Sequence, residues 1–315
     1  MIPTSCLLPF YAALILLFVV LFLKFTRGYY VIRKDLSDKT VLITGASGGI
    51  GEATARALAS SGATVHLLCR NLHKANRAAE AIKKETENDK IHVWESDLSS
   101  LESVRKFANK YLATSFPIDI LINNAGVMWI PTRQLSVDGF EMQMATNHFG
   151  HFLLTNLLLD RIKQSPKARI INVSSGNHWF ANLDLDNINL DSGYQDGVAY
   201  GNSKLANILF TRELARKLAG SEVTTHSLHP GVVATELLRH ASGLKFLSHV
   251  VRPFFKSPEE GAMTTLYAAT SDELGNQNGQ YFSDCGRGLM SWRAKDDKLA
   301  EKLWNLSAKM TGLEQ

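Results

Sequence analysis

A tyrosine and a lysine lie four residues apart in the segment 197–210, GVAYGNSKLANILF, which otherwise has the pattern of an amphipathic helix. Residues four apart are neighbours on a helix, so the phenol of Tyr200 and the ammonium of Lys204 would lie side by side. A phenol whose pKa is lowered by a nearby cation can donate and accept a proton near neutral pH. Because Y-x-x-x-K is frequent by chance, the pair indicates acid–base chemistry only together with other motifs.

A glycine-rich turn follows the first β-branched run of the chain. The sequence VLITGASGGIGEATARAL places Gly45, Gly49 and Gly51 between a strand and a helix, with Ser47 and Ile50 in the same turn. Glycines at such a turn let the backbone approach a pyrophosphate at the positive end of the following helix. The turn therefore predicts a dinucleotide-binding site.

Residues at the ends of the second and third predicted strands indicate which dinucleotide binds. An NAD site usually offers an acid to the ribose 2′-hydroxyl at the end of the second strand. This chain has Arg70 there, in LCRN, with no carboxylate beside it. An arginine suits a 2′-phosphate, to which Ser47 can add a hydrogen bond, so we expect NADP(H) rather than NAD(H). Asp97, which ends the third strand, is placed either to meet the adenine amino group or to cap the next helix.

Short β-branched runs alternate with helical patterns from residue 38 onward. The runs that predict strands are 40–46, 64–69, 90–97, 118–126, 168–175, 223–231 and 279–284. Near-continuous apolar strands separated by helices predict a Rossmann-like α/β fold, in which a doubly wound parallel sheet of about seven strands has helices on both faces. The segments 176–196 and 232–257 lack a clear period, and we interpret them as a substrate lid, with a helix resting on the bilayer as the alternative for 232–257.

The first residues have the composition of a membrane anchor. Residues 1–23 carry no charge, and the apolar run 7–23 would span roughly 25 Å as a helix. A cleaved signal peptide fits less well, because no basic residue precedes this run and no small-x-small site follows it. The basic residues that follow are Lys24, Arg27, Arg33 and Lys34. They would face anionic lipid and keep the body of the protein in the cytosol.

We therefore expect a single transmembrane helix over 1–25, a basic juxtamembrane segment over 26–37 and one catalytic domain over 38–315. Three distant cysteines, at positions 6, 69 and 285, predict neither a disulfide framework nor a metal site. Of the net charge of +4, residues 24–35 contribute +3. The remainder is close to neutral, which argues against a nucleic-acid partner.

Several motifs together resemble the short-chain dehydrogenase/reductase superfamily. In chain order they are TGASGGIG (44–51), NNAG (123–126), Asn147 in ATNHFGHF, NVSS (172–175), YGNSK (200–204) and HPGVVAT (229–235). INNAGVM, GHFLLTNLLLD, SKLANILFTRELA and YFSDC are similar to the membrane-anchored microsomal retinol dehydrogenases, which implies an endoplasmic-reticulum membrane protein. The stretch GNHWFANLDLDNINL after Ser175 departs from that pattern.

The resemblance implies a role for each candidate residue. Tyr200 would be the proton donor and acceptor, and Lys204 would lower its pKa and hold the nicotinamide ribose. An ammonium about 4 Å from the phenol gives roughly 4 kcal/mol at a dielectric near 20, enough for most of a three-unit shift. Ser175 would hold the substrate oxygen, with Ser174 as its rival. Asn147 would support a proton relay through water, and its alternative is a satisfied buried amide. The remaining cofactor contacts would be Asn124, Gly126, Pro230, Gly231, Val233 and Thr235.

The function expected from these observations is hydride transfer between NADP(H) and the carbonyl of retinaldehyde, in an enzyme anchored to the endoplasmic reticulum. The same chemistry on a lipid aldehyde, a sterol ketone or a polyprenoid is the first alternative. A non-catalytic NADPH-binding membrane scaffold is the second. The sequence leaves open the retinoid isomer, the physiological direction and the oligomeric state, a homodimer included.

Overall fold

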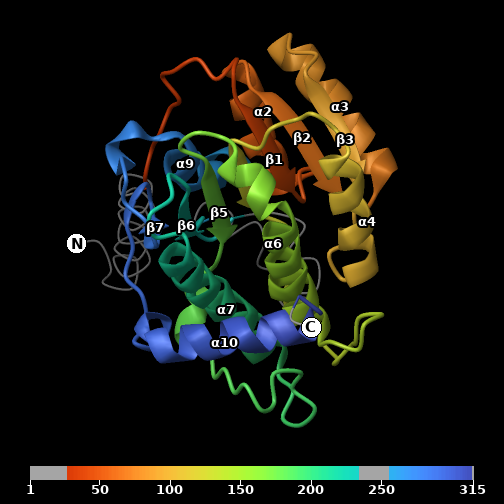
Figure 1. Cartoon of the computed structure of the whole chain (residues 1–315), viewed down its shortest axis with the longest axis vertical. Coiled ribbons are helices and arrows are strands. Elements are labelled where there is room, and N and C mark those ends of the chain that lie inside the picture. Colours follow the sequence, from red (N-terminus) through yellow and green to blue (C-terminus); the bar gives the residue numbers. More distant parts are fainter. Residues whose placement is uncertain (1–26, 234–254, 314–315) are drawn as a thin grey trace, which may run out of the picture.

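The apolar runs predicted as strands form one twisted sheet, with helices on both of its faces (Figure 1). The computed structural model describes residues 27–233 and 255–313. The strands lie in the order β3-β2-β1-β4-β5-β6-β7-β8. Their bounds are β1 Thr40–Thr44, β2 Thr64–Cys69, β3 Ile91–Glu95, β4 Ile120–Asn123, β5 Arg169–Val173, β6 Thr224–His229, β7 Gln280–Ser283 and β8 Gly286–Arg287. The first seven are parallel and match the seven predicted runs, whereas β8 pairs antiparallel with β7 and was not predicted.

Two layers of helices cover the sheet because successive strand residues face opposite sides. Val41 and Ile43 join the cluster under α2, α3 and α9, whereas Leu42 joins the cluster under α4, α6 and α7. The helices of the first layer are α2 Gly49–Ser60, α3 Leu72–Thr86 and α9 Pro258–Thr270. Those of the second are α4 Leu101–Leu112, α6 Gly150–Lys163 and α7 Asp196–Lys217. Each layer thus hides one set of alternating side chains from water.

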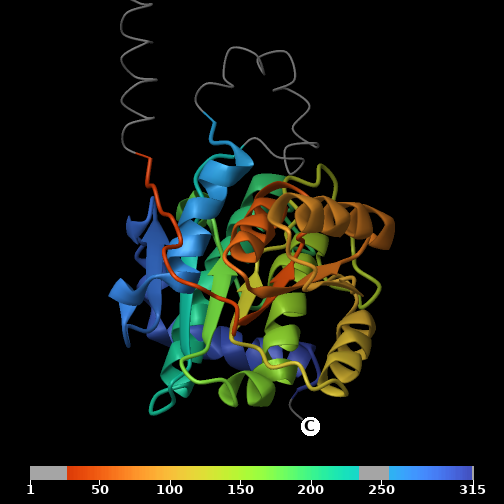
Figure 2. The same cartoon turned by 90° about the horizontal axis from the view of Figure 1, so that it is seen from above.

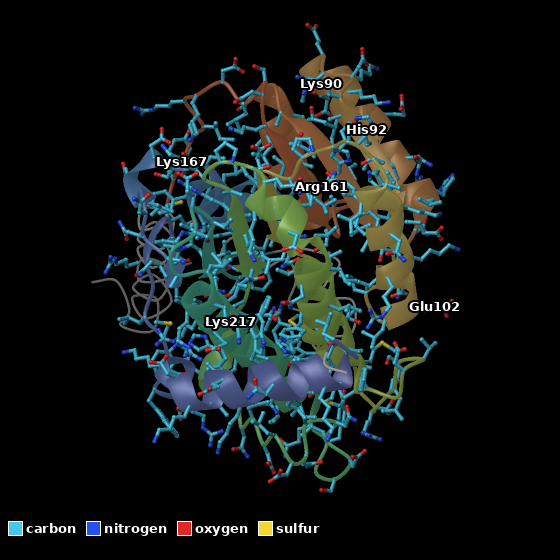
Figure 3. The ribbon with its side chains drawn as sticks, viewed as in Figure 1. Lys90, His92, Glu102, Arg161, Lys167 and Lys217 are labelled. Carbon is cyan, nitrogen blue, oxygen red and sulfur yellow. The ribbon has the colours of Figure 1, made fainter. Side chains whose placement is uncertain are left out.

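The C-terminal helix α10 (Asp297–Met310) packs on the outside of α6 and α7. The ring of Trp304 lies 4.9 Å from that of Phe152 and 5.7 Å from that of Phe210, centroid to centroid. Lys217, at the end of α7, places its ammonium 4.8 Å from the Trp304 centroid (Figure 3). The short elements are α5 Met142–Met144, the π-helix η1 Ala145–Phe149, and the 3₁₀ helices η2 Gly176–Phe180, η6 Asp272–Leu274 and η7 Arg293–Lys295.

The basic segment before β1 lies along α9, as Figure 2 shows for the red stretch beside the light-blue helix. Arg27 forms a 2.6 Å ion pair with Glu260, and Lys34 forms one of 2.5 Å with Asp272. These two cations pair with carboxylates of the same chain, and their expected role at a lipid surface stays a prediction. Lys24 and the expected anchor over 1–25 lie outside the described residues. Within the described residues, no helix is both long and apolar enough to span a bilayer.

The two segments without a clear period differ in the structure. Segment 176–196 begins with η2 and buries Leu183 and Ile188 in the cluster that α7 shares with α10. Most of segment 232–257 lies outside the described residues, so its interpretation as a lid stays a prediction.

Candidate active site

A cavity of about 380 Å³ opens at the carboxyl edge of the sheet, where an open α/β fold holds its ligand. It extends from Arg70 and Asp97, over the glycine turn, to Asn124 and Gly126. The predicted cofactor residues that line it are Gly45, Ser47, Gly49, Ile50, Gly51, Arg70, Asp97, Asn124 and Gly126. The lining does not include the described residues Tyr200, Lys204, Pro230, Gly231 and Val233. Thr235 lies outside the described part of the chain.

The glycine turn packs so closely against the segment after β4 that side chains would not fit. A Cβ on Gly51 would lie 2.4 Å from the Gly45 carbonyl oxygen, and one on Gly45, whose φ is +68°, would lie 2.8 Å from Ala125 Cα. No side chain of the described residues caps the start of α2. The first amide groups of that helix therefore stay available to an anion. This arrangement fits the pyrophosphate of a dinucleotide.

Two cations flank the adenosine end of the cavity. Arg70 is 63% exposed, and its Nη1 lies 3.8 Å from Asp97 Oδ2. The expectation that no carboxylate lies beside Arg70 is thus wrong for the folded chain, because the parallel pairing of β2 with β3 brings Asp97 next to it. Lys74, which the sequence analysis missed, lines the same cavity, and its ammonium would lie 3.4 Å from a Cβ on Gly48. Its position four residues after Arg70 could have signalled it.

The alternative interpretation of Asp97, as a helix cap, is wrong. Ser100 is the N-cap of α4, and its hydroxyl accepts a hydrogen bond from the Ser103 amide. The Asp97 carboxylate instead accepts hydrogen bonds from the Ser99 amide and hydroxyl, at 2.9 and 2.7 Å. Asp97 therefore shapes the turn after β3 and contributes to the cavity lining.

Tyr200, on α7, and Ser175, after β5, lie near each other at the buried end of the site. Tyr200 is only 5% exposed. Burial raises the pKa of its phenol to about 12, and the nearby Ser175 hydroxyl offsets part of this rise. The phenol is therefore protonated at neutral pH and is ready to donate.

Lys204 lies beside Tyr200 but does not act on it as expected. Its Nζ donates a 3.1 Å hydrogen bond to the Val173 carbonyl and lies 5.6 Å from the Tyr200 ring centroid. Burial lowers the pKa of Lys204 to about 8. The expectation that this ammonium alone brings the phenol pKa down toward neutrality is thus wrong for the protein without cofactor. The loss of solvation of a buried phenolate outweighs the attraction of a lysine that is itself poorly solvated.

The Asn147 side chain is a fully bonded amide within the π-helix η1. It donates to the Val127 carbonyl and the Ser203 hydroxyl, both at 2.9 Å, and accepts from the Val127 amide at 2.8 Å. These bonds hold the loop after β4 against α7. The structure therefore agrees with the satisfied-amide interpretation of the side chain, while the relay stays a prediction.

Sequence reasoning also missed a buried histidine that organises this edge. His151 Nδ1 lies 3.0 Å from the Asn147 carbonyl oxygen, so this nitrogen carries the proton. Its Nε2 must then accept from the Thr44 hydroxyl at 2.8 Å. The Thr44 oxygen accepts in turn from the amides of Asn124 and Ala125. Burial lowers the pKa of His151 to about 4, which keeps this chain of bonds intact at neutral pH.

Comparison with known proteins identifies the family of the chain. The family model described as short chain dehydrogenase matches residues 39–243. The chain belongs to the short-chain dehydrogenase family. It is an oxidoreductase of that family, and two of the motifs that predicted the membership, TGASGGIG and NNAG, line the cavity.

Several members of the family are similar over nearly the whole chain. Retinol dehydrogenase 12 of Homo sapiens is 47% identical, over 92% of this chain and 91% of its own. Human retinol dehydrogenase 13 is 45% identical, over 92% and 89%. A crystal structure of an uncharacterised protein from Mycobacterium paratuberculosis has a TM-score of 0.74 at 39% identity, covering 90% of this chain and 98% of that one. RhlG of Pseudomonas aeruginosa, solved with NADP, has a TM-score of 0.64 at 26% identity, covering 79% and 95%.

The rival serines of this dehydrogenase are separated by their contacts. Ser174 is buried and its hydroxyl donates to the Lys204 carbonyl at 2.7 Å, whereas the Ser175 hydroxyl faces Tyr200. Because the resemblance implies that Ser175 holds the substrate oxygen, we expect Ser175→Ala to lower kcat about 100-fold. Ser174→Ala, its matched control, should lower the melting temperature and leave kcat within about threefold. A larger loss of kcat in Ser174→Ala would reverse the assignment.

Proposed function

We propose that this protein is an NADP(H)-dependent retinol dehydrogenase, or retinal reductase, with Tyr200 as its acid–base residue. The observation that carries the proposal is the buried Tyr200 between Ser175 and Lys204, at the edge of the sheet that also holds the dinucleotide cavity. When bound, the nicotinamide supplies or accepts a hydride at C4. The residues of this chain handle the proton and the substrate oxygen.

Tyr200 and Ser175 divide the work at the carbonyl. The two hydroxyls lie near each other and together would hold the oxygen of an aldehyde or alcohol. A phenol whose pKa is near 12 is still a stronger acid than an alcohol, so Tyr200 would protonate the alkoxide formed in reduction. Lys204, 3% exposed, would stabilise the tyrosinate left behind. In the oxidative direction the same groups would remove the proton from the alcohol.

Three polar side chains support the choice of NADP(H). Arg70 and Lys74 would place positive charge at the adenosine end of the cavity, whose lining also includes Ser47 of the glycine turn. A 2′-phosphate would find charge-assisted partners there. Asp97 lies beside Arg70, and a phosphate that draws the guanidinium away would break only a long 3.8 Å contact.

The substrate class rests on the relatives together with the apolar N-terminal run. The relatives above carry the name retinol dehydrogenase, and retinaldehyde partitions into lipid. We propose an anchor over 1–25, the basic segment 26–37 and a catalytic domain over 38–315, held at the cytosolic face of the endoplasmic reticulum. Such an enzyme would take its substrate from the bilayer.

A panel of lipophilic carbonyls tests the substrate class. With the full chain in membranes and NADPH in excess, we expect kcat/KM for retinaldehyde to exceed that for a C9 alkenal and for a ketosteroid by at least about tenfold, because a matched apolar pocket gains with each buried methylene. If the alkenal or the ketosteroid turns over faster, the chemistry stands and the retinoid assignment fails.

A further inference from the structure

A buried lysine lies at the carboxyl edge of the sheet, outside the residues assigned so far. The Lys256 side chain is 7% exposed. Its ammonium lies 2.6 Å from Asp284 Oδ1 and donates to the Pro230 carbonyl at 3.2 Å. An ammonium removed from water is costly unless it is paired and hydrogen-bonded, so both partners hold it in place.

Lys256 contacts the turn after β6 through both its backbone and its side chain. Its backbone amide donates to the Val232 carbonyl at 2.8 Å, and it forms an isolated parallel bridge with Val233. The lysine stem also lies directly on Gly231, whose φ is +92°, since a Cβ there would come within 2.8 Å of Lys256 Cδ and Cε. The family resemblance implies cofactor contacts for Pro230, Gly231 and Val233 in this turn, with Val233 at the nicotinamide carboxamide.

Asp284 connects the same lysine to the basic segment at the start of the described chain. Its Oδ1 accepts from the Gly28 amide at 3.4 Å, and a Cβ on Gly28 would lie 2.0 Å from the Asp284 carbonyl carbon. Next to Gly28, Arg27 pairs with Glu260, whose carboxylate also accepts from the Ser257 amide at 2.8 Å. The basic segment, the turn after β6 and the end of β7, which are distant in the sequence, thus meet around the Lys256–Asp284 ion pair.

We propose that Lys256 and Asp284 are positioning residues that fix the 230–233 turn for the nicotinamide end of the cofactor, with Gly28 and Arg27 of the basic segment completing their support. The inference rests on the proposed NADP(H) site. A small displacement of a reacting ring lowers the rate of transfer strongly, so a rigid turn has a direct catalytic benefit. The basic segment is then part of the frame of the active site as well as a connection to the proposed anchor.

The test compares Lys256→Met and Asp284→Asn with an exposed ion pair that the basic segment forms elsewhere. Lys34→Met and Asp272→Asn break the 2.5 Å pair between that segment and η6. In full-length protein, NADPH binding is followed by cofactor fluorescence with no substrate present. We expect Lys256→Met and Asp284→Asn each to raise the Kd for NADPH about tenfold and to lower kcat, with the KM for retinaldehyde nearly unchanged. The control variants should leave the Kd within about twofold.

The double variant and the unfolding temperature complete the design. Because the two groups act as a pair, Lys256→Met with Asp284→Asn should raise the Kd no further than either change alone. Lower melting temperatures with an unchanged Kd and unchanged kcat would overturn the proposal. If Lys256→Met does not fold, the Kd for NADPH and the kcat of Asp284→Asn and Gly28→Ala decide whether the proposal holds. The Kd for NADPH is measured without substrate, so the two proposals can fail separately. If the unchanged protein does not turn over retinaldehyde but the variants show the expected rise in Kd, the proposed function is rejected and this inference stands.

Discussion

Tyr200→Phe is expected to lower kcat about 1,000-fold while NADPH still binds. The change removes one hydroxyl from a side chain that is buried near Ser175. General acid–base catalysis by a positioned side chain is worth about 10²- to 10⁴-fold. Steady-state kinetics with retinaldehyde and a fluorescence titration with NADPH measure both quantities. Phe and Tyr have the same ring, so the packing of α7 should be retained.

Tyr194→Phe is the matched control for this prediction. Tyr194 is also a partly buried phenol, and its hydroxyl donates to the Ile130 carbonyl at 2.7 Å. Loss of that bond should cost about 1 kcal/mol of stability and leave kcat within about threefold. Undiminished turnover in Tyr200→Phe would remove the catalytic assignment of Tyr200, whereas NADPH binding without turnover in the unchanged protein would favour the non-catalytic scaffold.

Arg70→Asp is expected to reverse much of the cofactor preference. A charge-assisted hydrogen bond to a phosphate is worth about 1.5–3 kcal/mol, and the new carboxylate would also repel that group. We expect kcat/KM for NADPH to fall about 100-fold, whereas that for NADH, which lacks the 2′-phosphate, should stay within about threefold.

Arg77→Asp makes the same charge change at an exposed position of α3 that is not in the cavity lining. It should affect NADPH only through weak, screened attraction, by less than about threefold. Equal losses with NADPH and NADH in Arg70→Asp would show that Arg70 supports the fold and does not select the cofactor. A Lys74→Met change combined with Arg70→Asp should lower NADPH use further.

The sequence predicted the sheet well because its signals are local. All seven parallel strands coincide with β-branched runs. The glycine turn could be predicted because the close packing at Gly45 and Gly51 leaves no room for a side chain. β8 escaped prediction because two residues have no measurable period. The C-terminal helix α10 covers α6 and α7 through Trp304, a contact between segments far apart in the chain.

The sequence predicted which types of residue form the site, and its errors concern what surrounds those residues in the folded chain. The distance between Arg70 and Asp97 depends on β2 lying beside β3, which LCRN does not reveal. The pKa of Tyr200 depends on how deeply α7 is covered by the rest of the fold, and the Y-x-x-x-K spacing does not reveal how deeply the tyrosine is buried. His151 and Lys256 act through partners more than 25 residues away, Thr44 and Asp284, so only the folded chain brings them together.

Deuterium transfer from labelled NADPH to retinaldehyde tests the central claim most directly. The full chain in membranes is mixed with retinaldehyde and NADPH that carries deuterium at nicotinamide C4, on one face in one sample and on the other face in a second. The product is then analysed by mass spectrometry. The account predicts retinol with one deuterium at C15 from one of the two labelled cofactors, and at least about 100-fold less of it with Tyr200→Phe. Retinol without deuterium from both labelled cofactors, or equal yields from the two proteins, would contradict it.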